Sequence, residues 1–300
     1  MHKVLITFSS VGFSNSFTPS KLLLIIEFNR HMKRFVILTV LSFVVIILPT
    51  SIIAQVGGLS GSKLGALCVD VVDNKAVEFE PAFFHIVSRK TWDDEGHLKD
   101  IFGSADSVIH TTGINFRFTY GLFDKLEFGA SISTDLQLSN WGIRYIVYSK
   151  KKLGIALIAG ANIPFGNKVV DNSIRLSDNL TSVGGGVILS TQFSENLSLD
   201  VNAQYMAFVK TTTEKHKGSY YFNADLGYYV FKHQLQLIAG VGYQQSAFDT
   251  FTSSTLTIYP GITVETGNNY IIVLSAPFDI SGHNAIKNAG FALALTLTFN

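Results

Sequence analysis

Cysteine is almost missing from this chain of 300 residues, which contains only Cys68. A single thiol cannot form an internal disulfide, so a small oxidised scaffold held together by disulfides is excluded. Cys68 is also a poor candidate for lipid attachment, because Leu67 precedes it where a small residue would be expected. Histidine pairs of the His-x-x-x-His kind are absent from the sequence, so this common zinc-binding pattern is missing too.

Charged residues are also scarce. They make up 15% of the chain against 47% hydrophobic residues, which is more apolar and less charged than a typical soluble protein. Residues 1–54 hold five of the basic residues and one acid, so the rest of the chain carries a small acidic excess. Without a basic surplus, nucleic acid is not an expected partner. Aromatic residues, in contrast, are plentiful, with 24 Phe and 11 Tyr.

The N-terminal region has the pattern of a targeting segment. Lys33 and Arg34 precede an apolar run over residues 35–48, and residues 49–54 end in the small side chain of Ala54. This order predicts a secretory signal peptide over residues 32–54. The rival interpretation is a membrane-anchoring helix, since residues 35–54 are long enough to span a bilayer. Because Met32 directly precedes the basic pair, residues 1–31 are predicted to lie upstream of the true start.

The C-terminal residues alternate strictly between large apolar and small side chains. The large ones are Phe291, Leu293, Leu295, Leu297 and Phe299. A period of two places them on one face of a strand, which suits lipid on that side and a lumen on the other. This strand is also the expected contact for the outer-membrane assembly machinery.

Similar runs recur along the chain. We count twelve, at about residues 75–88, 108–119, 125–134, 140–149, 152–163, 181–193, 196–208, 219–231, 233–245, 254–265, 268–276 and 289–299. Longer connections, at 89–107, 164–180, 209–218, 246–253 and 277–288, alternate with short turns. An even strand number and this alternation are typical of bacterial outer-membrane barrels. The sequence therefore predicts an all-β, transmembrane antiparallel barrel of about twelve strands over residues 75–300.

Residues 55–74 precede the first strand and contain several glycines with little charge. Two interpretations stay open for them, a periplasmic tail or a plug that folds into the lumen.

The same alternation predicts which charged residues face the lumen. On the strand at 233–245, Leu235 and Leu237 share one face and Gln234 and Gln236 the other. Charges inside a barrel must be hydrated or paired, so they indicate either a water-filled solute path or an ion-pair network that closes the lumen. The predicted lumen set is Glu78, Glu80, Arg117, Glu127, Arg144, Asp200 and Asp225.

Other chemistry has weaker support in the sequence. Asp93, Asp94 and Glu95 beside Gly96 could supply oxygen ligands to calcium, but their spacing matches no calcium loop, and a solvated acidic hairpin tip is the preferred interpretation. The histidines are scattered singly and specify no nucleophilic catalytic set. No catalytic residue and no cofactor is predicted.

One stretch resembles a known family. Residues 117–129, Arg-Phe-Thr-Tyr-Gly-Leu-Phe-Asp-Lys-Leu-Glu-Phe-Gly, and the later Ile-Pro-Phe-Gly at 163–166 are similar to the outer-membrane transporter family associated with the meta-pathway of phenol degradation. The chain departs from that pattern at Thr119, where the family tends to have arginine. The resemblance implies passage of small solutes, aromatic ones among them, across the outer membrane.

From these observations we expect a passive channel for small solutes. Two alternatives stay open, an outer-membrane enzyme such as a lipase-type barrel and a closed structural or adhesive barrel.

Overall fold

A computed structural model describes residues 55–61, 63–102, 107–134, 138–164, 181–209, 216–231, 234–266 and 270–299. The predicted signal peptide and the stretch before it lie outside these residues. All described residues belong to one compact unit, Pro49–Asn300. Within the described part of the chain, no helix is both long and apolar enough to cross a membrane.

The described chain is built from strands whose alternating side chains suit a sheet with two different faces. The strands are β1 (Val77–Trp92), β2 (Leu98–Asp100), β3 (Ile109–Phe123), β4 (Leu126–Ser133), β5 (Leu138–Lys150), β6 (Leu153–Pro164), β7 (Ser182–Gln192), β8 (Leu197–Phe208), β9 (His216–Phe231), β10 (Leu235–Phe248), β11 (Thr252–Glu265), β12 (Tyr270–Ser275), β13 (Phe278–His283) and β14 (Ala285–Phe299).

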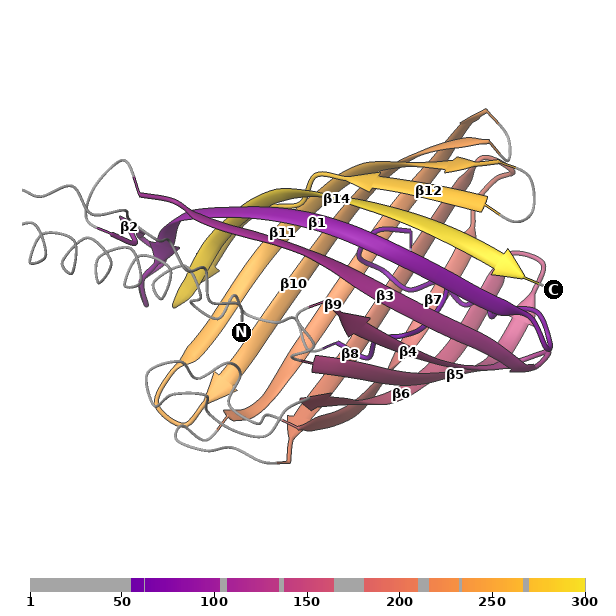
Figure 1. Cartoon of the computed structure of the whole chain (residues 1–300), viewed down its shortest axis with the longest axis horizontal. Helices are drawn as coiled ribbons and strands as arrows, with labels where there is room; N and C mark the ends of the chain where they lie inside the picture. Colours follow the sequence, from indigo (N-terminus) through magenta and orange to yellow (C-terminus); the bar gives the residue numbers. More distant parts are fainter. Residues whose placement is uncertain are drawn as a thin grey trace, which may run out of the picture. The chain divides into compact units, whose positions relative to one another are not determined.

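These strands close into one antiparallel barrel, because β14 pairs with β1 along most of its length, from Val77↔Phe299 to Trp92↔Ala285. Strands β12 and β13 both pair with β11 and with β14, so together they form a single wall strand interrupted at Ala276 and Pro277. The short β2 only extends the edge of β1. The wall therefore has twelve strands, which confirms the predicted fold class (Figure 1).

The prediction of a long connection at residues 277–288 is wrong. This region forms β13 and the first part of β14, joined by a tight turn at Asn284, which has a positive φ of 47°. Polar side chains help to hold it, since Asp279 accepts hydrogen bonds from the Thr257 hydroxyl at 2.5 Å and from the Asn288 N–H at 2.8 Å. Strands are predicted from the alternation of apolar residues, and side-chain hydrogen bonds of this kind cannot be recognised from that alternation.

Two other predicted connections are shorter than expected. Strand β1 continues to Trp92, inside the predicted connection at 89–107, and β10 and β11 leave only residues 249–251 between them. The predicted short turns after Phe123, Lys150 and Gln192 lie where the sequence places them.

The outward and inward faces follow the predicted parity. Leu157 and Leu237 are 52% and 47% exposed, whereas their neighbours Ile158 and Gln236 are buried. Eight aromatic side chains at the short-turn end are exposed on the outer surface, as expected for an interfacial belt. They are Phe118, Tyr120, Phe123, Tyr148, Phe193, Phe231, Tyr270 and Phe299.

Candidate functional site

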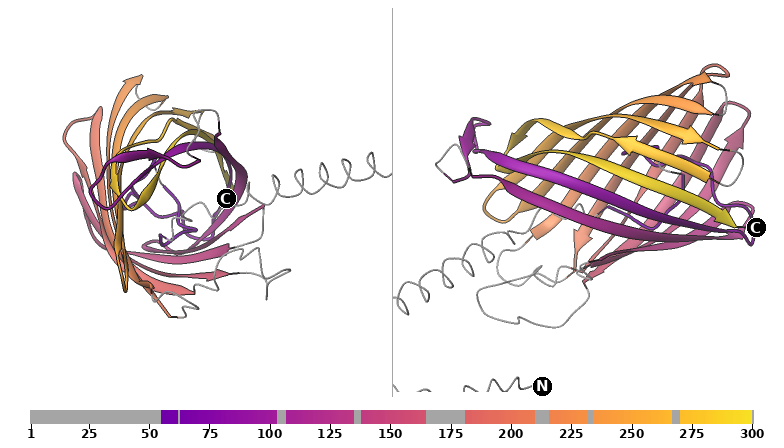
Figure 2. Two further views of the ribbon diagram at one scale, coloured as in Figure 1. Left: turned by 90° about the vertical axis from the view of Figure 1, so that its left-hand side faces the viewer. Right: turned by 45° about the horizontal axis from the view of Figure 1, so that its top comes forward.

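Residues 55–61 and 63–76, called the inner segment below, lie inside the ring of strands (Figure 2, left). The segment joins β1 at the short-turn end, where the Lys75 N–H donates to the Gly121 carbonyl and the Gly121 N–H donates to the Ala76 carbonyl. From there it reaches across the lumen. Gly58 lies against β4, and Gly65 lies against Tyr259 of β11.

Glu127 of β4 and Arg144 of β5 face each other in the wall and form one anchor for this segment. They are joined at 2.7 Å, and both side chains are fully buried. Glu127 accepts the N–H of Ser60 at 3.0 Å and the N–H of Val72 at 2.8 Å, while Arg144 donates to the Cys68 carbonyl at 2.6 Å. A buried ion pair needs such additional hydrogen bonds to offset its loss of hydration.

Arg117 of β3 forms a second anchor. Its guanidinium lies 2.5 Å from Glu78 and 2.8 Å from Glu80, both on β1, and donates to the Leu59 carbonyl. Two positions away on the same strand, Thr119 donates to the Gly58 carbonyl at 2.7 Å. The residue that departs from the family pattern therefore contacts the inner segment directly.

The opposite side of the lumen holds the segment through Asp225 of β9. One oxygen of this carboxylate accepts three successive main-chain N–H groups, those of Leu64, Gly65 and Ala66, each at 2.9 Å. Asp200, directly across from Asp225 on β8, pairs with Lys63 at 2.7 Å. Each charge is thus partnered by the segment.

Neutral wall side chains complete the contacts. Gln204 accepts the Val56 N–H at 3.0 Å, Asn202 accepts the Leu67 N–H at 3.0 Å, and Ser190 accepts the Val69 N–H at 2.9 Å. The buried NH₂ groups of Asn202 and Gln204 have no hydrogen-bond partner among the described residues.

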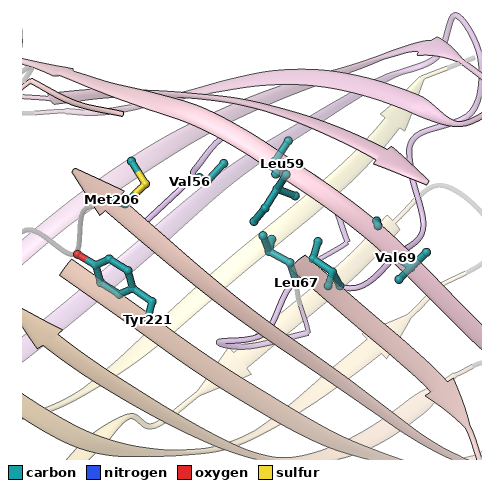
Figure 3. Close-up of a cluster of buried hydrophobic side chains, with 9 residues drawn as sticks. Val56, Leu59, Leu67, Val69, Met206 and Tyr221 are labelled. Atoms are coloured by element: carbon teal, nitrogen blue, oxygen red, sulfur yellow. The ribbon is translucent and has the colours of Figure 1, made fainter. Parts of the chain in front are cut away.

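An apolar cluster also joins the segment to the wall (Figure 3). Val56, Leu59, Leu67 and Val69 pack against inward side chains of β6 to β9, namely Ala156, Ile158, Ile188, Met206 and Tyr221. Full burial of a side chain of this size contributes roughly 1.5–3 kcal/mol to stability, so the cluster stabilises the bound segment in addition to the polar anchors.

Glycines in the wall make this close approach possible. A methyl group at Gly129 would overlap the Gly58 carbonyl, and one at Gly121 would overlap the Asp73 carbonyl. Gly58 itself has a φ of +79°, a conformation that glycine adopts without strain.

The structure thus places five of the seven predicted lumen residues, Arg117, Glu127, Arg144, Asp200 and Asp225, in contact with the inner segment, while Glu78 and Glu80 bind Arg117. The acidic loop is separate: Asp93 forms an ion pair with Lys99 at 2.8 Å and accepts the N–H groups of Glu95 and His97. The hydrogen bond from Lys99 lowers the pKa of Asp93 to about 2. In the described part of the chain, no group of three or more His, Cys, Asp and Glu residues is arranged to hold a metal ion.

Sequence reasoning missed Thr119, Ser190, Asn202, Gln204 and Lys63. One signal was available, since the inward parity of Ile158, Ile188 and Met206 is inconsistent with a lumen filled only by water. Apolar side chains on the inner face predict an apolar occupant.

A closed twelve-stranded barrel with an apolar, aromatic-rimmed outer face and a polar lumen is an outer-membrane β-barrel. The chain belongs to the family described as "Putative MetA-pathway of phenol degradation", which matches residues 140–295, just over half of the chain. This confirms the family resemblance, although the match excludes the stretch 117–129 that first suggested it.

Solved structures of bacterial outer-membrane channels are similar to it. An outer membrane channel from Pseudomonas putida F1 has a TM-score of 0.62 and 14% identity, covering 77% of this chain and 98% of that one. A structure described as the CymD monoaromatic hydrocarbon channel has a TM-score of 0.41 and 9% identity, covering 75% and 88%. The KdgM porin has a TM-score of 0.44 and 7% identity, covering 74% and 99%. At these identities the likeness shows the fold alone. None of the curated proteins matches the sequence.

Proposed function

We propose that this protein is a passive outer-membrane channel for small solutes, aromatic ones among them, and that the inner segment keeps it closed until the segment moves. The carrying observation is that the residues lining the lumen bind residues 55–76 rather than only one another. A twelve-stranded barrel is wider than one that side chains can fill, so the segment supplies the missing packing. Membership of a family named for phenol degradation supports aromatic solutes.

The geometry of attachment supports movement. The inner segment joins the wall covalently only through Ala76 and β1, and its other end leads to the predicted cleavage point after Ala54. A segment tethered at one end can leave the lumen toward the short-turn side without unfolding the barrel.

The second candidate is a closed structural barrel. It is favoured by the ion pairs Arg117–Glu78 and Arg144–Glu127, in which charges that an open path would expose to water are paired with each other.

A reversible tether distinguishes the two. Val69 lies against Gly154 of β6, where an added Cβ would be 3.1 Å from the Val69 Cβ. This is close to the Cβ separation of a disulfide, so Val69→Cys with Gly154→Cys should form one after a small shift. The background carries Cys68→Ser, and each single substitution serves as a control.

In a planar bilayer, the oxidised double variant should give no single-channel openings, and dithiothreitol should restore the openings seen in the single-substitution controls. If the controls and the reduced protein stay silent at every voltage, the closed structural barrel is correct. If the oxidised protein conducts as well as the controls, solutes pass without movement of the segment.

A further inference from the structure

We propose that the inner wall of this barrel is a binding site for a peptide main chain, and that it accepts an irregular, bent peptide of small and apolar residues supplied separately from the short-turn side. This inference rests on the proposed function, in that the inner segment must be able to leave. Residues 55–76 are then the resident occupant of a more general site.

The first argument is which atoms the wall contacts. Eight main-chain N–H groups of the described inner segment donate to wall side chains; they belong to Val56, Ser60, Leu64, Gly65, Ala66, Leu67, Val69 and Val72. Three of its carbonyls, those of Gly58, Leu59 and Cys68, accept from wall side chains. Its polar side chains contribute less, since only Ser60 and Lys63 bind wall side chains in the described residues.

Main-chain groups are the same in every residue except proline, which lacks the N–H, so this site recognises backbone shape more than side-chain identity. Extended peptides that pair with a sheet edge are recognised in a related way, with main-chain bonds giving affinity and pockets giving preference. Here side-chain oxygens on the inner face take the place of the sheet edge.

The hydrogen bonds to Asp225 show this recognition of the main chain clearly. Asp225 is fully buried, and one of its oxygens accepts three successive N–H groups. Successive N–H groups that converge on one anion form a concave nest. Any peptide that can curve as Leu64–Ala66 does offers the same nest to this carboxylate.

The wall also sets which side chains fit. A Cβ at Gly57 would lie 2.7 Å from the Asn140 Cβ, and one at Gly58 would lie 2.5 Å from the Ala130 nitrogen, so the peptide must carry little bulk at these two positions. The apolar cluster, in contrast, accepts branched side chains at Val56, Leu59, Leu67 and Val69. The ligand class is therefore a bent, non-helical peptide with small residues at the glycine positions and apolar residues at these four.

The test uses the full chain, so that the barrel folds with its own segment. A recognition site for a sequence-specific protease is inserted between Asn74 and Lys75, and the folded protein is cut and washed. A synthetic peptide of residues 55–74, carrying a fluorophore at its C-terminus, is then added. Uptake is followed by fluorescence anisotropy in detergent, and block of conductance is followed in a planar bilayer.

We expect the peptide to bind the cut barrel and to block conductance from the short-turn side only. A peptide with Ser60→Ala and Lys63→Ala should bind within about tenfold of the parent. A peptide N-methylated at Gly65 and Ala66 should bind about 100-fold more weakly, because two hydrogen bonds to a buried carboxylate are lost. In the wall, Asp225→Asn should weaken binding of the peptide. Glu265→Gln is the control and should not weaken it, because Glu265 accepts a hydrogen bond from Tyr229 and does not bind the segment.

Each outcome bears on the inference. The binding site is overturned if the cut barrel does not take up the peptide. It is also overturned if the N-methylated and parent peptides bind equally, or if the side-chain substitutions weaken binding as much as N-methylation does. Peptide uptake by a cut barrel that never conducts supports the binding site but contradicts the proposed channel. Conductance without uptake supports the channel and overturns the binding site.

Discussion

At the scale of single residues, absent side chains matter as much as present ones. Gly129 faces the lumen on β4, next to Glu127 with its buried ion pair, and its lack of a Cβ lets the Gly58 carbonyl approach the wall. This approach also brings Gly58 within hydrogen-bond reach of Thr119. One missing methyl group thereby positions the start of the inner segment.

Gly129→Ala should displace the inner segment near Gly58 and increase the time that the channel spends open. Loss of the Thr119 contact and of packing beside it, worth at least about 1.4 kcal/mol, corresponds to about tenfold. Single-channel recording measures the open time. Gly290→Ala is the matched control, because its methyl group would overlap the His85 carbonyl of the wall, and its nearest neighbours are His85 and Ile86 of β1 and not the segment. An equal effect of both substitutions would contradict the explanation.

Asp93 offers a pH prediction outside the membrane. Lys99 lowers the pKa of this carboxyl to about 2, so the loop contacts made by the carboxylate should be complete above its ordinary pKa of about 3.9 and disappear as pH falls toward 2. The amide resonances of Glu95 and His97, which donate to Asp93, should titrate with a midpoint near 2. Lys99→Gln should raise that midpoint; an unchanged midpoint would show that Lys99 is not the cause.

At the scale of elements, the two faces of one strand have different roles. On β6, Leu157 faces outward and Ile158 belongs to the cluster around the inner segment. Ile158 is therefore not free to become polar, as it would be in a barrel with a water-filled lumen.

Leu157→Arg should reduce the free energy of unfolding by about 2 to 4 kcal/mol, because it places a charge in lipid. Leu157→Phe, which keeps the site apolar, is the control. Ile158→Asn should instead mainly increase channel opening by weakening the hold on Val56 and its neighbours. Urea unfolding in lipid vesicles and single-channel recording separate these effects. Similar changes in both measurements for both variants would show that the parity is wrong.

At the scale of the whole molecule, the charges of the lumen depend on where the inner segment lies. With the segment inside, Lys63 pairs with Asp200 and main-chain N–H groups satisfy Asp225. With the segment gone, the five predicted lumen acids stay in the wall with Arg117 and Arg144, and Asp279 of β13 is a further buried carboxylate there.

The open channel should therefore prefer cations at low salt, and the preference should fade as salt screens the wall. The reversal potential across a salt gradient measures it. Glu127→Gln with Asp225→Asn should weaken the preference while also increasing the open time, because both carboxylates bind the segment. An anion-selective open state would show that other groups line the path.

The sequence alone determined the barrel. Strict alternation, as in Leu237 beside Gln236, shows which face contacts lipid, because the side chain at each position is set by whether that position faces lipid or the lumen. It also determined strand number and the end of the barrel at which the short turns lie. Alternation failed near residues 277–288, where Pro277, Gly282 and the Asn284 turn interrupt it although the strands continue.

Only the tertiary structure decided between a periplasmic tail and a segment within the lumen, and it gave the charges their partners. The Leu64 N–H and Asp225 are 161 positions apart, and the Ser60 N–H and Glu127 are 67 apart. Such contacts depend on closure of the wall by β14 and β1, which carries distant strands around to opposite sides of one lumen. The local period of the strands does not encode these contacts, because a strand with the same alternation could line an empty lumen or an occupied one.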